Sequence, residues 1–142
     1  MADYGIQVTL ALGFGESVER TRAALATQGF GVLTEIDVAA TMKSKLDVDL
    51  PPYLILGACN PPLAHRAIEL DASIGMLLPC NVVVRAIDDT HTLVEAMNPE
   101  LMVSATGNAA LAPIAADASS RLTAALDSLN GSTSDEAAAT AR

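Results

Sequence analysis

The amino-acid sequence predicts an α+β fold, a two-layer sandwich in which a mixed or antiparallel sheet packs against helices on one face. Stretches of strand-like alternation occur between stretches with helical spacing of apolar residues. Two strand-like stretches, 79–87 and 92–97, have only a turn around Asp88-Asp89 between them, which indicates a hairpin. Because the strands of a hairpin are antiparallel, a purely parallel sheet is disfavoured. A hydrophobic content of 51% in 142 residues is enough for one core.

The N-terminal part of the chain predicts two strands with a helix between them. Residues 4–12 alternate well enough between apolar and polar side chains to form a strand with one buried face. Glycines then interrupt the strand, and Ser17 is expected to cap a helix over 18–28. Gly29 suits the left-handed conformation that ends many helices, so 30–37 is expected to be the second strand.

The middle of the chain predicts two capped helices with a strand between them. Asp37 is expected to cap a short helix over 38–46. Two prolines then start extended chain, and the apolar run at 53–58 has the length of a strand. Asn60 is expected to cap the next helix, over 61–70, which has a proline at its favoured first position.

The C-terminal part predicts the hairpin and one long helix. The strand at 79–87 is the clearest in the chain, because it contains three successive valines. Residues 99–107 are expected to be irregular or to form a single helical turn. A long helix then opens at Asn108. Its core-facing stripe is expected to consist of Leu111, Ile114, Ala118, Leu122, Ala125 and Leu129.

The chain is expected to contain one domain, over residues 1–130. No internal repeat and no linker divides this region. Residues 131–142 are small and polar and show no period, so they are expected to be a disordered C-terminal tail.

The charge of the chain argues against several classes of partner. The formal net charge is −9, from 17 acidic and 8 basic residues, and the basic residues are scattered. Nucleic acids and anionic membranes are bound chiefly by clustered Lys and Arg. The chain also has no Trp and few other aromatics to stack on bases. We therefore expect no nucleic-acid partner and no membrane partner.

The expected location is the cytoplasm. No stretch approaches the ~20 uninterrupted apolar residues that span a bilayer. The N-terminus lacks the positive region and apolar run of a secretion signal. Two cysteines are also too few to cross-link a small secreted fold.

The two cysteines of the chain lie in matching Cys-Asn dipeptides beside prolines, as Cys59-Asn60-Pro61 and Pro79-Cys80-Asn81. Cys59 is expected at the end of a strand and just before a helix, where the helix dipole favours a thiolate. Cys80 is expected at the start of a strand. If these two strands are antiparallel neighbours, the thiols come within disulfide range. If the strands are parallel, the cysteines lie at opposite ends and share no site.

Three further residues surround this candidate site. Asn60 and Asn81 either supply amide hydrogen bonds to a ligand or only cap a helix and satisfy a strand edge. His65 either reaches toward the start of its helix or is a solvated helix residue. Its spacing from Cys59 matches no zinc-site pattern. No phosphate-binding loop and no nucleophile elbow is present, so neither a catalytic reaction nor a cofactor is identified.

Longer motifs resemble a known family. The segments Thr41–Leu46, Pro52–Pro61 and Leu77–Val84 resemble the signature of domain of unknown function 302, and the likeness is dense over 36–87. The resemblance implies a small α+β domain, similar in fold to the TATA-binding-protein-like group, that associates as dimers. It carries no established activity, and a shared fold does not by itself imply DNA binding.

Two functional hypotheses follow. In the first, Cys59 and Cys80 form a thiol-redox, metal or small-ligand site, with Asn60, Asn81 and His65 around it. In the second, the domain is a non-catalytic dimerisation or interaction module in which the Cys-Asn-Pro segments are turn and packing devices. The second hypothesis predicts that Cys→Ser at either position mainly lowers stability, by about 1–3 kcal/mol. A homodimer is the expected assembly.

Overall fold

The computed structural model describes residues 4–141, with side chains described over 4–130. A five-stranded antiparallel sheet has the strand order β1-β5-β4-β3-β2. The elements are, in chain order, β1 (Gly5–Leu10), α1 (Phe14–Thr27), β2 (Gly31–Asp37), α2 (Val38–Leu46), β3 (Tyr53–Cys59), α3 (Pro61–Leu70), the 3-10 helix η1 (Ala72–Leu77), β4 (Cys80–Ala86), β5 (Thr92–Met97), α4 (Leu101–Thr106), the 3-10 helix η2 (Ala109–Leu111) and α5 (Ala112–Ala141).

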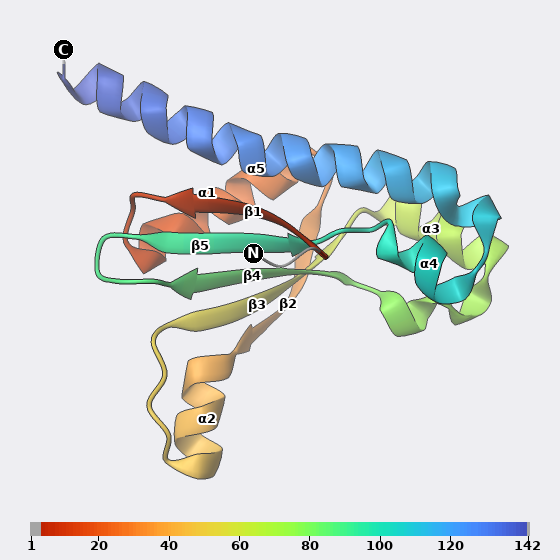
Figure 1. Cartoon of the computed structure of the whole chain (residues 1–142), viewed down its shortest axis with the longest axis horizontal. Coiled ribbons are helices and arrows are strands. Elements are labelled where there is room, and N and C mark those ends of the chain that lie inside the picture. The colour runs from red at the N-terminus through yellow and green to blue at the C-terminus, as the bar shows by residue number, and fades with distance from the viewer. Residues whose placement is uncertain (1–3, 142) are drawn as a thin grey trace.

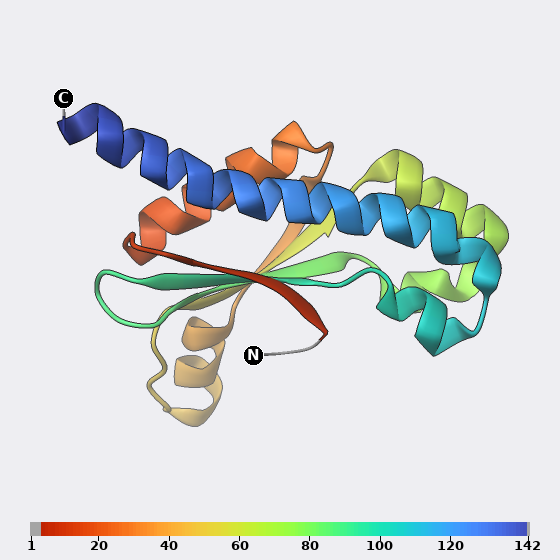
Figure 2. The same ribbon diagram turned by 45° about the horizontal axis from the view of Figure 1, so that its top comes forward.

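The helices form a layer on one face of the sheet, which confirms the predicted α+β fold class. Helices α1, α3 and α5 lie on the same side of the strands, and α5 runs across the whole molecule (Figure 1). Helix α2 differs, because it projects on the opposite side of the sheet (Figure 2). None of its residues is buried. The sheet therefore has one covered face, and we call the other face the open face.

The core lies between the covered face and the helices. Alternation along the central strands places Leu56, Val82, Val84 and Val94 against the helices, and all four are fully buried. The stripe predicted for the C-terminal helix supplies the other side of this core, because each of its six members is buried. Its first member belongs to η2, and the others lie on α5.

The predicted caps are confirmed at two helices and wrong at a third. Asp37 accepts a hydrogen bond from the Ala40 amide at 2.9 Å, and Asn60 accepts one from Leu63 at 3.3 Å. Ser17 does not cap α1, because that helix begins at Phe14. The hydroxyl of Ser17 instead donates to the Gly13 carbonyl at 2.8 Å from inside the first turn. A serine within a helix can satisfy its hydroxyl in this way, so it does not need a cap position.

The C-terminal helix α5 extends as far as Ala141. The expected disordered tail over 131–142 falls on residues whose side chains lie outside the description, so it stays a prediction. In the part of the chain that is described, no helix is both long enough and apolar enough to cross a membrane.

Candidate functional site

Strands β3 and β4 are antiparallel neighbours, which is the arrangement that the shared-cysteine hypothesis requires. Ala58 of β3 is the register partner of Cys80 of β4, and Cys59 is the next residue along β3. Cys59 is therefore one residue beyond the register partner of Cys80, and the two cysteines lie close together at the same end of the sheet. Both are free thiols, with Cys80 buried and Cys59 half-buried.

The space beside the two cysteines is small and mostly apolar. A cavity of about 30 Å³ lies between the ends of β3 and β4 and the helices. Apart from the two cysteines and Asn60, its lining is apolar, with Leu63, Ala67, Met102 and Ile114 among its members. A volume of this size has room for about two water molecules. No buried side-chain nitrogen or oxygen in the described residues lacks a hydrogen-bond partner.

The environment of Cys80 favours the neutral thiol. Burial raises the pKa of the Cys80 thiol to about 11, and the nearby charge of a Cys59 thiolate raises it as well. The thiolate is the nucleophile and the metal-binding form of cysteine. At neutral pH, Cys80 is therefore a small buried apolar group and a poor partner in thiol chemistry.

Both polar side-chain atoms of Asn60 make hydrogen bonds within the protein. Its side-chain oxygen caps α3, and its side-chain nitrogen donates to the Gln28 carbonyl at 3.3 Å. Gln28 is the C-terminal cap residue of α1, and the next residue, Gly29, has a positive φ of 81°. The Asn60 amide thus connects the end of α1 to the start of α3, and both of its polar atoms are occupied.

The structure does not bring the other two candidates to the cysteines. His65 lies on the exposed side of α3, where its Nδ1 atom is 3.4 Å from Glu69. Asn81 is exposed and lines a separate hollow together with Tyr53, Val83 and Glu95. Among the described residues, no group of three or more His, Cys, Asp or Glu side chains is placed to hold a metal ion.

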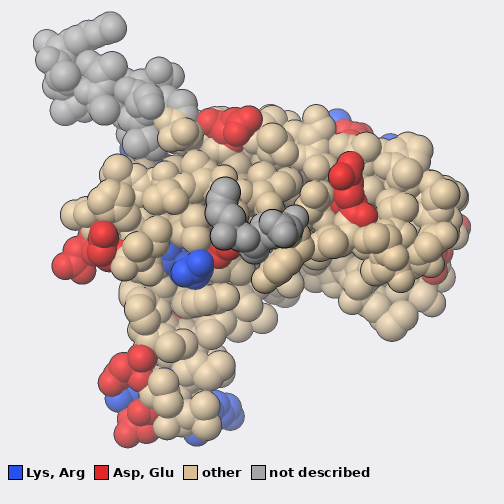
Figure 3. All heavy atoms as spheres, in the orientation of Figure 1, with Lys and Arg blue, Asp and Glu red and all other residues tan. Residues whose placement is uncertain are grey.

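A larger hollow lies on the open face, at residues that the sequence reasoning did not select. This groove has a volume of about 940 Å³ and lies between the strands and the segment that leads from α2 into β3. The segment contributes Leu50, Pro51 and Pro52, and the strands contribute Tyr53 and Arg85 among others. The surface seen in Figure 3 is mostly uncharged over the sheet, and charged groups gather at the tip of the α2 segment.

A hydrogen-bonded polar group lies within the groove. The Gln7 side-chain nitrogen donates to Glu95 Oε2 at 2.5 Å, and Arg85 Nε donates to Glu95 Oε1 at 2.9 Å. Strand alternation contained the signal for this group. In the sequence, Arg85 and Glu95 stand at positions that point away from the buried valines of the predicted hairpin.

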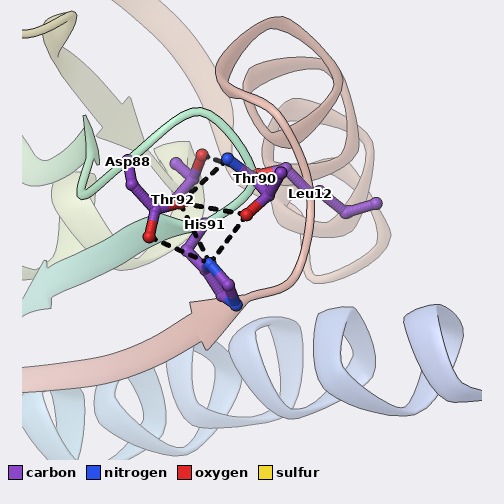
Figure 4. Close-up of polar contacts among 5 residues, drawn as sticks. All are labelled: Leu12, Asp88, Thr90, His91 and Thr92. Carbon is purple, nitrogen blue, oxygen red and sulfur yellow. Dashed lines mark hydrogen bonds and ion pairs between the residues drawn. The ribbon is translucent and has the colours of Figure 1, made fainter.

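A second polar cluster stabilises the turn between β4 and β5 through hydrogen bonds (Figure 4). Asp88 accepts hydrogen bonds from the backbone and the hydroxyl of Thr90, at 2.8 and 3.1 Å, and lies 3.0 Å from His91 Nδ1. The backbone hydrogen bond of Thr90 and the contact with His91 lower the pKa of Asp88 to about 2. Thr92 donates to the Leu12 carbonyl at 3.0 Å, which connects the turn to the end of β1. These contacts account for the turn without a ligand.

The fold and the groove define a small two-layer α+β domain with a sheet that is covered on one face and open on the other. The family model described as domain of unknown function DUF302 matches residues 6–129. The chain is similar to the crystal structure of an uncharacterized conserved DUF302 protein from Bacillus stearothermophilus, with a TM-score of 0.81 and 34% identity. That match covers 89% of this chain and 98% of the other. A search of curated proteins finds no match.

The chain belongs to the DUF302 family, as the resemblance of its motifs predicted.

Proposed function

We propose that the chain is a non-catalytic module that self-associates through the α2 arm, and that its Cys-Asn-Pro segments are structural. We define the α2 arm as residues 38–50, which comprise α2 and the segment after it. The observation that carries this proposal is the exposure of the arm. Helix α2 buries none of its residues. Two apolar side chains of the arm are exposed to solvent, Leu46 at 66% and Val48 at 43%.

The exposed apolar side chains of the arm gain free energy when a second protein surface covers them. Ile36, at the end of β2, is also 50% exposed and extends the apolar surface toward the sheet. Contiguous exposed apolar groups are typical of protein–protein contact sites. In a two-fold homodimer both copies contribute the same patch, so one projecting arm per chain is sufficient to form the contact.

The charge of the arm favours a second copy as its partner. The whole chain has a net charge of −9, so two copies repel one another over most of their surfaces. The arm contains two lysines and two aspartates and is therefore locally neutral. Lys43 already contacts Asp47 at 2.9 Å and Asp49 at 3.2 Å. Two copies can approach along this part of the surface without net repulsion.

The test is a sedimentation-equilibrium measurement on the double variant Leu46→Asp/Val48→Asp. The wild-type protein is expected to be a dimer at micromolar concentration. The two aspartates are expected to raise the dissociation constant about 100-fold, because they place charges in an apolar contact.

Met76→Asp is the matched control for this experiment. Met76 lies in η1 and is 83% exposed, so this variant adds one negative charge, against two in the arm variant, at an exposed apolar residue outside the arm. It is expected to remain dimeric. A monomeric wild-type protein, or equal weakening by the control, would contradict self-association through the arm.

The structural role of the cysteines has a separate test, the pH dependence of stability. The pKa of Cys80 is raised from 9.0 to about 11 in the folded chain. The folded state therefore holds its proton more tightly, so the stabilising effect is complete below pH 9 and is lost as the pH rises to 11. The expected loss is at most about 2–3 kcal/mol.

Urea denaturation of the wild type and of Cys80→Ala between pH 8 and pH 11 isolates this effect. The alanine variant lacks the thiol, so its stability is expected to fall less over this range, although other groups titrate in both proteins. Iodoacetamide at pH 8 is also expected to modify Cys59 before Cys80. Equal pH profiles together with rapid alkylation of Cys80 would argue for a reactive thiol pair and against the packing role.

A further inference from the structure

The open face carries a donor group that the protein itself does not use. Within the described residues, Arg85 donates through Nε to Glu95, and its two terminal amino groups donate to no protein acceptor. Both oxygens of Glu95 already accept hydrogen bonds, one from Arg85 and one from Gln7. The terminal amino groups of Arg85 therefore remain as hydrogen-bond donors, and a ligand that binds them must supply acceptor atoms.

The strand register fixes where these donors lie. Two rows of register partners cross the open face side by side. The first row is Tyr53, Arg85, Leu93 and Thr9, and the second is Ile55, Val83, Glu95 and Gln7. Arg85 is thus flanked on the neighbouring strands by an aromatic and an aliphatic residue. Its contact with Glu95 in the next row orients the guanidinium group before a ligand arrives.

The walls of the groove suit a flat apolar body. Leu50, Pro51 and Pro52 line one side, and Tyr4 and Tyr53 contribute aromatic rings. The volume of about 940 Å³ is within the range of small-molecule sites, which are mostly apolar with a few placed polar groups. The groove combines both features.

Charge restricts the ligand to a single negative group. Arg85 and Glu95 cancel one another within the groove, and the chain as a whole carries −9. A doubly charged phosphate would meet more repulsion from this field than a carboxylate does. The planar guanidinium also matches the two oxygens of a carboxylate. We infer that the groove binds a small monocarboxylate with an apolar, aromatic or aliphatic body, held by the terminal amino groups of Arg85.

The inference does not require self-association: Leu50 belongs both to the α2 arm and to the groove wall, but the arm variant changes only Leu46 and Val48, which do not line the groove. The experiment is a titration followed by NMR, including the Arg85 Nε–H signal. It is made on the wild type and on Leu46→Asp/Val48→Asp, so that failure of one proposal is separated from failure of the other. The probes are benzoate, 3-phenylpropionate and octanoate, with 3-phenylpropionamide as the uncharged match and phenyl phosphate as the doubly charged one.

Saturable shifts are expected at Arg85, Tyr53 and Leu93 with at least one carboxylate, and binding of the amide is expected to be at least tenfold weaker. Arg85→Lys retains the charge and a partner for Glu95 but loses the planar fork, so it is expected to weaken binding about tenfold. Arg66→Lys on the exposed side of α3 is the control and is expected to change nothing. The absence of saturable shifts with all three carboxylates, equal binding of the amide, tighter binding of phenyl phosphate, or shifts confined to other surfaces would overturn the inference.

Discussion

The variant Gly57→Ala is expected to lower the free energy of unfolding by about 2–3 kcal/mol, because the close approach of two neighbours leaves no room for a side chain. A β-carbon at this position would lie 2.1 Å from Thr34 Oγ1 and 2.9 Å from Pro79 Cγ. Thr34 belongs to β2, and Pro79 directly precedes β4. Gly57 thus allows Thr34 and Pro79 to approach β3 closely beside the Cys-Asn segments. Urea denaturation measures the effect.

Gly31→Ala is the matched control, since Gly31 lies on the neighbouring strand and a β-carbon there meets no atom within 4 Å. We expect it to change stability little or to increase it slightly. The double variant Gly57→Ala/Thr34→Ala removes the closer of the two contacts and is expected to recover part of the loss. If Gly57→Ala is as stable as the control, the close packing of β2, β3 and Pro79 is not tight in solution.

The variant Asn60→Ala is expected to destabilise the fold by about 2–3 kcal/mol, because it removes the cap of α3 and leaves the Gln28 carbonyl without its donor. Asn60 is only 8% exposed, so water replaces these hydrogen bonds poorly. Asn60→Asp keeps the capping oxygen but lacks the donor, and it is expected to be intermediate. Thermal and urea denaturation measure both variants.

Asp37→Ala is the control for this pair, because Asp37 caps α2 at an exposed position and makes no bridge between helices. Its expected cost is at most about 1 kcal/mol. If Asn60→Ala costs no more than Asp37→Ala, the connection between α1 and α3 contributes little. A role for Asn60 in binding would then deserve a new test.

The two Cys-Asn dipeptides look alike in the sequence but differ in the fold. Asn60 is buried and caps a helix, whereas Asn81 is exposed and faces the open side of the sheet. The difference arises because Asn60 precedes a helix, while Asn81 lies within a strand where neighbouring residues face opposite sides. Repetition of a short motif therefore did not indicate a repeated role.

Local chemistry in the sequence was sufficient for most of the secondary structure. Caps at Asp37 and Asn60, the left-handed Gly29 and the stripe on the C-terminal helix depend on residues close in sequence, and the structure confirms them. Ser17 was misplaced because a serine can either cap a helix or bond back to a carbonyl within its first turn. Both choices satisfy the hydroxyl, so the residue type alone does not decide between them.

The sequence by itself determined the fold class, the hairpin, the core-facing stripe and the family, because each depends on residue patterns along one segment. The tertiary structure decided which side chains meet. The register between β3 and β4 made the cysteines neighbours and left only a small apolar cavity beside them. The order of the strands brought Gln7 to Glu95 across 88 positions of sequence. Contacts of this range depend on how strands pair, and no local pattern encodes that pairing.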